Sequence, residues 1–253
     1  MAASIRVDLL LVERGLAETR TRAQALILSG RVYSGESRIE KAGTRLDPET
    51  PLSIRETLPY VSRGGLKLHA ALEHFGIDPA GAICLDVGAS TGGFTDCLLK
   101  AGAAGVFAVD VGYGQLDWKL RNDNRVTVLE RTNFRTIHDD ALPHDLDLAV
   151  VDVSFISLKL ILPRLKNFLS AGARVVVLIK PQFEAGRKKV GKGGIVRDPA
   201  VREEVVEFII EAATREGFTP RGCMESPIKG ANGNVEFLAY FLWEGEGTKN
   251  VPG

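Results

Sequence analysis

Apolar and polar residues follow two different patterns along this chain, and the change falls near residue 83. From there on, short apolar runs are separated by stretches with helical spacing. The apolar runs predict strands at residues 83–87, 105–109, 126–129, 146–151, 174–179 and 236–243. The helical spacing predicts helices at residues 95–101, 157–169 and 202–215. Apolar strands that alternate with helices indicate a parallel sheet covered on both faces, so we predict a doubly wound α/β domain.

Residues 5–57 have the pattern of a smaller unit. Their apolar positions predict two helices followed by short strands, at residues 6–14, 19–28, 31–33 and 50–54. Thr19 is a suitable N-cap for the second helix, and Gly30 is a suitable residue to end it. The pattern therefore assigns residues 1–57 to a small α+β domain, 58–64 to a linker, 65–246 to the α/β domain and 247–253 to a loose tail.

Composition narrows the class of protein. The chain has 253 residues and no net charge, but residues 1–67 carry 11 Lys or Arg against 8 Asp or Glu, and residues 180–197 carry six basic residues against one acidic residue. Each basic region is either a solvated surface or a contact for nucleic acid. No apolar run reaches the roughly 18 residues of a membrane span, and the N-terminus lacks the pattern of a secretory signal. Three widely spaced cysteines without a CxxC pair favour a cytoplasmic protein without a structural metal.

The strand predicted at residues 83–87 runs into a glycine-rich segment. Glycines let the backbone approach a ligand closely, and ligands of open α/β sheets bind at the carboxyl ends of the strands. The spacing differs from the G-x-G-x-x-G of dinucleotide sites and from the P-loop, although the glycines alone could simply close a turn. Asp110 ends the next strand, where a carboxylate accepts the ribose hydroxyls of a nucleoside cofactor. The candidate cofactor residues are Asp86, Gly88, Ser90, Thr91, Gly92, Gly93, Phe94 and Asp110.

Four charged residues are predicted at the rim of the sheet that holds this glycine segment, namely Lys67, Asp152, Lys180 and Glu236. Buried charges must be paired, and two lysines with two carboxylates meet that need, so two structural ion pairs are one interpretation. The other is catalysis, because a ribose 2′-hydroxyl must be positioned and relieved of its proton before it attacks. We assign Lys180 as the general base, oriented by Asp152 and Glu236. Lys67 would tune that base or steady the ribose.

These motifs together resemble the TlyA family of ribosomal RNA methyltransferases, which is related to the FtsJ group of 2′-O-methyltransferases. The resemblance covers about residues 5–243, and its signatures fall at residues 61–68, 86–93, 152–157, 180–184 and 193–198. The Lys-Asp-Lys-Glu set of the FtsJ group falls on the four charged residues above. Residues 5–57 resemble the small RNA-binding domain first described in ribosomal protein S4, with Ser34 in place of the usual Asn before the turn glycine.

The resemblance implies a fold, a cofactor and a substrate. The fold would be a class I methyltransferase sheet, mostly parallel with an antiparallel edge strand, and the cofactor S-adenosyl-L-methionine, without a metal. The reaction would be methylation of a cytidine ribose in the ribosomal RNA of a ribosomal subunit, with the target nucleotide flipped out of its helix. Residues 187–192 would form a lid or RNA-contacting loop. The residues implied in RNA binding are Arg6, Arg20, Arg22, Arg31, Arg63, Arg187, Lys188 and Lys189.

Two other functions stay open at this point. One is an RNA-binding ribosome assembly factor whose methyltransferase domain is inactive, and the other is a membrane-active hemolysin, because members of the family have also been described in that way. The intact four-charge set argues against the first, and the lack of a membrane-spanning run argues against the second. The oligomeric state stays open as well, with a monomer as the working expectation.

Overall fold

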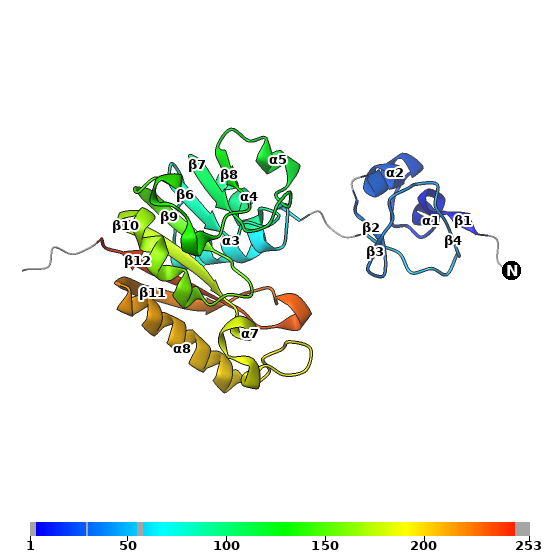
Figure 1. Ribbon diagram of the computed structural model, residues 1–253. Coiled ribbons are helices and arrows are strands. Elements are labelled where there is room, and N and C mark those ends of the chain that lie inside the picture. Colours follow the sequence, from blue (N-terminus) through cyan, green and yellow to red (C-terminus); the bar gives the residue numbers. More distant parts are fainter. Residues whose placement is uncertain (1–3, 29, 55–57, 246–253) are drawn as a thin grey trace, which may run out of the picture. The chain divides into compact units, whose positions relative to one another are not determined.

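The chain folds into two compact units, Met1–Leu58 and Pro59–Gly253, each with its own hydrophobic core (Figure 1). The structure is a computed structural model and describes residues 4–28, 30–54 and 58–245. Residues 59–63, which the sequence assigns to a linker, lie against the large unit, because the Val61 amide donates to Asp96 Oδ2 (2.9 Å) and Lys100 Nζ donates to the Pro59 carbonyl (2.5 Å).

The small unit consists of two helices and short antiparallel strands. Its elements are β1 (Ile5–Arg6), α1 (Val7–Glu13), α2 (Arg20–Leu28), β2 (Val32–Ser34), β3 (Ser37–Arg38), β4 (Arg45–Leu46) and β5 (Ser53–Ile54). Thr19 Oγ1 accepts from the Arg22 amide (3.1 Å), so Thr19 caps α2 as its sequence predicts. Gly30 follows α2 with a φ of +71°, and its amide donates to the Ile27 carbonyl.

The large unit is built on one sheet of seven strands. They are β6 (Ile83–Val87), β7 (Gly105–Val109), β8 (Val126–Leu129), β9 (Leu146–Val151), β10 (Leu169–Ile179), β11 (Phe218–Glu225) and β12 (Phe237–Trp243). Their order is β11-β12-β10-β9-β6-β7-β8, and β12 pairs antiparallel with both of its neighbours while the other pairs are parallel. The sheet is mostly parallel, as the sequence pattern predicts, with the antiparallel edge that the family resemblance implies.

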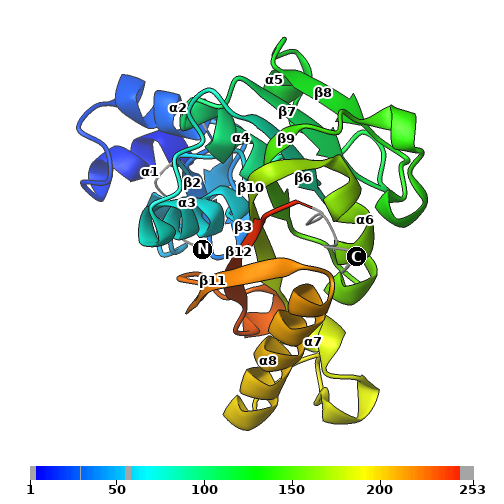
Figure 2. The same cartoon turned by 90° about the vertical axis from the view of Figure 1, so that its left-hand side faces the viewer.

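Helices cover both faces of this sheet (Figure 2). They are α3 (Gly64–Phe75), α4 (Gly93–Lys100), α5 (Trp118–Arg121), α6 (Leu162–Leu165), α7 (Pro181–Glu184) and α8 (Pro199–Arg215). The 3₁₀ turns are η1 (Phe134–Thr136), η2 (Asp139–Ala141), η3 (Leu158–Leu160), η4 (Lys166–Phe168), η5 (Arg187–Lys189) and η6 (Ala231–Gly233). In β10, Val175 and Val177 pack in the cluster with α6 and α8, whereas Val176 packs in the cluster with α3 and α4. A strand buried on both faces is therefore apolar throughout.

Two local predictions were wrong. The segment 157–169 is not one helix but η3, α6 and η4, because Pro163 lacks the amide that a helix interior needs and is accommodated in the first turn of α6. Strand β11 was missed. It is an edge strand that contains Pro220 and Gly222, with a register shift between them, and it carries few of the apolar residues that mark a central strand.

Candidate functional site

The glycine-rich segment joins β6 to α4 at the place where the sheet changes its winding direction. From β6 the chain continues to β7 and β8 on one side, whereas β9 and β10 lie on the other side. Gly88 has a φ of +87°, and a Cβ on it would lie 2.4 Å from the Asp152 carbonyl oxygen, so the backbone of this segment lies directly against the end of β9. The carboxyl ends of strands at such a point form the ligand crevice of open α/β sheets.

Two adjoining cavities open at this point, with volumes of about 470 Å³ and about 460 Å³. Both are lined by residues of the glycine segment and of the end of β9, namely Gly88, Ser90, Asp152, Ser154 and Phe155. The first is lined in addition by the predicted residues Thr91, Gly93 and Phe94, and the second by Asp110. Gly92 lies under Leu116 and Leu120 instead, where a Cβ would meet both side chains.

The carboxylate of Asp110 is fixed by backbone amides. Its Oδ2 accepts from the Ser90 amide (2.8 Å), and its Oδ1 accepts from the Gly112 amide (2.6 Å). Each oxygen keeps a second lone pair for a ligand. The structure therefore holds Asp110 on the wall of the second cavity in one orientation.

Asp86 lies beneath the glycine segment and not on a cavity wall. It is fully buried, its Oδ2 accepts from Thr95 Oγ1 (2.6 Å), and its Oδ1 has no hydrogen-bond partner. Burial disfavours the charged carboxylate and raises the pKa of Asp86 to about 7. Asp86 thus supports the segment from below through Thr95 of α4.

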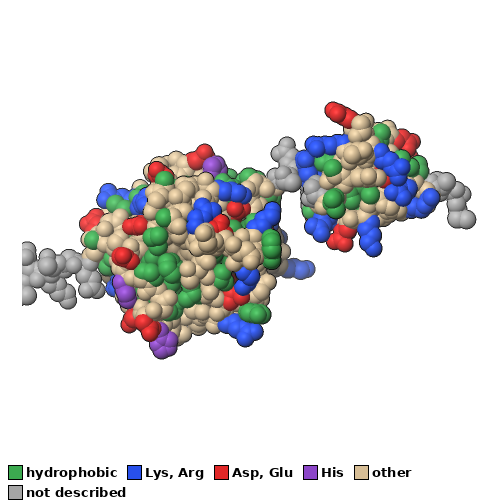
Figure 3. Space-filling view, turned by 90° about the horizontal axis from the view of Figure 1, so that it is seen from above, with side chains coloured by type: hydrophobic (Ala, Val, Ile, Leu, Met, Phe, Trp, Pro, Cys, Tyr) green, Lys and Arg blue, Asp and Glu red, His purple; other side chains and the backbone are tan. Residues whose placement is uncertain are grey.

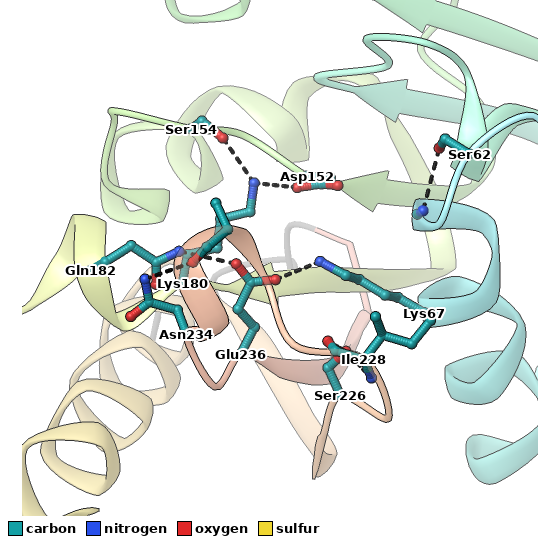
Figure 4. A network of polar contacts seen from close by, with 12 residues as sticks. Ser62, Lys67, Asp152, Ser154, Lys180, Gln182, Ser226, Ile228, Asn234 and Glu236 are labelled. Atoms are coloured by element: carbon teal, nitrogen blue, oxygen red, sulfur yellow. Dashed lines mark hydrogen bonds and ion pairs between the residues drawn. The ribbon is translucent and has the colours of Figure 1, made fainter. Parts of the chain in front are cut away.

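The four predicted charges meet on the wall of the first cavity as two ion pairs (Figure 4). Lys67, from α3, lies 2.5 Å from Glu236 Oε2 at the start of β12. Lys180, after β10, lies 2.5 Å from Asp152 Oδ1 at the end of β9. The first helix and the last strand of the large unit, far apart in sequence, therefore contribute to one site.

The pairing differs in one respect from the sequence assignment, which had both carboxylates orienting Lys180. Glu236 takes its hydrogen bonds from Lys67 Nζ and from Gln182 Nε2 (3.0 Å), whereas Lys180 Nζ donates to Ser154 Oγ (2.9 Å) besides its pair with Asp152. The reason is geometric, because Lys67 projects from α3 toward Glu236. Gln182 and Ser154 were missed, although each lies within two residues of an assigned charge.

Phe155 is an aromatic residue that the sequence analysis overlooked. Its side chain is 90% exposed, it lines both cavities, and its ring centroid lies 4.8 Å from that of Phe183. Its φ is +64°, a conformation that is uncommon for a bulky residue and that concentrates at functional sites. Glu184 Oε1 accepts from the Leu158 amide (2.8 Å) and so ties α7 to the segment that carries Phe155.

In the small unit, the arginines implied in RNA binding are organised by a buried carboxylate. Asp8 is fully buried and accepts from Arg6 Nε and Nη2 (3.0 and 2.9 Å), Arg20 Nε (3.0 Å) and Gln24 Nε2 (2.9 Å). These bonds, above all the one from Arg6, hold the pKa of Asp8 well below its usual range. Lys and Arg side chains are prominent over this unit in the space-filling view (Figure 3).

The other basic residues implied in RNA binding are spread over the chain. Arg22 is exposed, and Arg31 is half-buried. Arg63 is exposed and lines the first cavity. Lys188 is exposed in η5, Lys189 pairs with Glu204 (2.5 Å), and the side chain of Arg187 lies outside the described part of the chain.

Across residues 4–28, 30–54 and 58–245, no group of three His, Cys, Asp or Glu side chains is placed to hold a metal ion. Within the same part of the chain, each helix is too short or too polar to cross a membrane.

Comparison with known proteins covers both units. The model of the FtsJ-like methyltransferase family matches residues 60–242, and that of the S4 domain matches residues 5–51. The chain is 52% identical to YqxC of Bacillus subtilis, over 96% of its own length and 87% of that protein. It is 49% identical to the 16S/23S rRNA (cytidine-2′-O)-methyltransferase TlyA of Mycobacterium tuberculosis, over 96% and 90%. A solved structure of a hemolysin-like protein from Streptococcus thermophilus is 46% identical, with a TM-score of 0.74 over 97% of this chain and 90% of that one.

Replacing Asp8 by Asn tests the buried carboxylate of the small unit. The amide leaves Arg6 and Arg20 without their charged acceptor, so we expect Asp8→Asn to destabilise this unit by about 1–3 kcal/mol. Hydrogen exchange of the α1 and α2 amides in the full chain measures the loss. Glu13→Gln, an exposed carboxylate of α1, is the matched control and should leave exchange unchanged. Equal protection in both variants would contradict the role given to Asp8.

Replacing Asp86 by Asn tests the pKa of the buried carboxylate. The folded chain holds the Asp86 proton up to pH about 7, whereas the unfolded carboxyl, with a pKa of 3.8, has lost it. The free energy of unfolding should therefore fall as pH rises from about 4 to about 7, and Asp86→Asn should flatten that slope. Urea denaturation at several pH values measures it, with Asp145→Asn, an exposed carboxylate, as control. A slope that Asp86→Asn leaves as steep as in the control refutes the assignment.

Proposed function

The chain belongs to the FtsJ-like methyltransferase family and carries an S4 domain before its methyltransferase unit, and on this premise we propose that it methylates a cytidine ribose 2′-hydroxyl in ribosomal RNA. The observation that carries the proposal is the meeting of two Lys–carboxylate pairs on one cavity wall beside the glycine segment. The TlyA protein of Mycobacterium tuberculosis, with that reaction in its name, supports it at 49% identity.

The residues at the sheet rim fit S-adenosyl-L-methionine as the methyl donor. A backbone that passes close to the end of β9 at Gly88, and a carboxylate of Asp110 held on the second cavity wall, suit the close approach and the ribose hydroxyls of a nucleoside. The exposed Ser90 and Thr91 would face its polar groups from the first cavity. When bound, this cofactor supplies an electrophilic methyl group on a sulfonium.

Lys180 is the general base of the proposed reaction. In its neutral form Lys180 Nζ would accept the proton that the ribose hydroxyl gives up on methylation. Asp152 and Ser154 hold the Lys180 side chain in place through contacts of 2.5 and 2.9 Å. The Lys67–Glu236 pair on the same cavity wall would steady the acceptor ribose, so that much of the acceleration comes from positioning.

The substrate would be bound by stacking and by charge. Phe155 offers an exposed aromatic face at the edge of both cavities, which suits a base that has left its helix. In the small unit, Arg6 and Arg20 keep guanidinium N–H groups beyond those bound by Asp8, and these would contact phosphates and fix register. The partner is ribosomal RNA within ribosomal subunits of the cytoplasm.

Replacing Lys180 by Ala and by Arg tests the general base. Arginine keeps the positive charge but cannot give up its proton, so both variants should lose at least about 100-fold in kcat if the lysine accepts a proton. The assay follows tritiated methyl transfer to deproteinised ribosomal RNA and to assembled subunits. Lys119→Ala, an exposed lysine of α5, should retain full activity.

The same assay decides between the open functions. Activity retained by Lys180→Arg alone would overturn the base and leave an electrostatic role for Lys180. Absence of label on any RNA with the unaltered chain would favour the assembly factor with an inactive domain.

Replacing Phe155 by Leu and by Tyr tests the stacking surface. Stacking of a base on an aromatic ring contributes about 1–3 kcal/mol, so Phe155→Leu should raise KM for the RNA by about tenfold or more while cofactor affinity holds. Phe155→Tyr keeps the ring and should remain within about twofold of the unaltered enzyme. An unchanged KM in Phe155→Leu would rule out stacking by this residue.

A further inference from the structure

Two turns that are far apart in sequence meet beside Glu236. One is the glycine turn, residues 191–196, which follows the basic η5 and is closed by a hydrogen bond from the Gly191 amide to the Ile195 carbonyl (3.0 Å). The other is the β12 turn, residues 230–234, which precedes Glu236 and is closed by a bond from the Gly230 amide to the Asn234 carbonyl (2.8 Å).

Asn234 joins these turns with its whole side-chain amide. It is 2% exposed, its Oδ1 accepts from the Val196 amide (3.1 Å), and its Nδ2 donates to the carbonyls of Gly194 (2.9 Å) and Ala231 (3.0 Å). One acceptor and two donors are thus satisfied, and a buried amide satisfied in this way holds its partners in a single arrangement. The labelled side chain lies beside Gln182 and Glu236 in Figure 4.

Asn232 adds a second, weaker connection. Its Nδ2 donates to the Gly193 carbonyl (3.1 Å), and its exposed side chain stands on a residue with a φ of +57°. Asn232, itself in the β12 turn, therefore joins the two turns by one hydrogen bond, whereas Asn234 joins them by two and adds a third within the β12 turn.

The β12 turn lies directly against the Glu236 carboxylate. A Cβ on Gly230 would lie 2.0 Å from Glu236 Oε1, although the φ of Gly230, −72°, is one that any residue adopts. Gly230 and Ala231 also line the first cavity together with Glu236. A shift of this turn therefore changes the space available to the carboxylate that pairs with Lys67.

We propose that Asn234 is a positioning residue that joins the basic segment 187–192, through the glycine turn, to the Glu236 carboxylate. The proposal rests on the proposed RNA methyltransferase function. Under it, RNA binding by the basic segment and the position of the Lys67–Glu236 pair depend on each other. RNA that engages the basic segment would fix the glycine turn, and Asn234 would carry that constraint to the β12 turn and its Gly230.

The test uses the full chain and two measurements, one of them independent of activity. Asn234→Ala removes two of the three side-chain hydrogen bonds between the turns, so trypsin should cleave the folded protein after Lys188, Lys189 or Lys192 about tenfold faster or more. Its kcat for ribosomal subunits should fall about tenfold or more, because Glu236 is misplaced. Cofactor affinity should stay unchanged, because the variant does not touch the glycine segment or Asp110. Asn232→Gly keeps the positive φ and removes one bond between the turns while the Asn234 bonds stay in place, so cleavage and KM should rise while kcat stays within about twofold.

Two further variants test the basic segment and the contact between Gly230 and Glu236 separately. Glu204→Gln frees Lys189 without touching either turn, so cleavage after Lys189 should rise with kcat unchanged. Gly230→Ala leaves the Asn234 bonds in place and crowds Glu236, so kcat should fall about tenfold or more without faster cleavage.

The outcomes are distinguishable. If Asn234→Ala retains kcat within about twofold, or loses kcat without faster cleavage, the proposal is overturned. If Asn234→Ala fails to fold, Asn232→Gly decides by its trypsin cleavage and Gly230→Ala by its kcat, and either readout left unchanged overturns the proposal. If the unaltered chain labels no RNA, the proposed function fails by itself, and trypsin cleavage that Asn234→Ala leaves unchanged still overturns the connection between the turns.

Discussion

The buried pair of Lys67 and Glu236 joins the first helix of the large unit to the last strand of its sheet. Neither charge could be buried alone, because an unpaired buried ion costs several kcal/mol. The pair therefore requires α3 and β12 to reach the same rim, and that rim also holds the end of β9 and the glycine segment. The meeting of charges on the first cavity wall and the packing of α3 against β12 therefore depend on each other.

The glycine segment and the two ion pairs are connected by a backbone contact. Gly88 packs against the backbone carbonyl of Asp152, and the side chain of the same Asp152 pairs with Lys180. Asp86 secures the same segment from below through Thr95, and Asp110 secures it from the side through the Ser90 amide. These contacts hold the glycine segment and the Lys180–Asp152 pair in a fixed arrangement, as a transfer between two held reactants requires.

In the small unit, a buried carboxylate fixes the side chains of an exposed surface. Asp8 is buried and charged, and it holds Arg6 and Arg20 in fixed orientations while part of each guanidinium remains exposed. Arginines placed in this way lose less freedom on meeting a phosphate than free side chains would. In both units, a buried carboxylate thus holds a cation in a fixed position.

The sequence by itself determined the fold class, the glycine segment and the four charges, because apolar strands that end in polar residues place those residues at one rim of a sheet. Tertiary structure alone decided which lysine pairs with which carboxylate, that Gln182 and Ser154 complete the pairs, and that Phe155 stands exposed between two cavities. It also decided the edge strand β11 and the connection through Asn234. The physical reason is that periodicity reports which face of an element is buried, whereas partners are set by where distant elements meet.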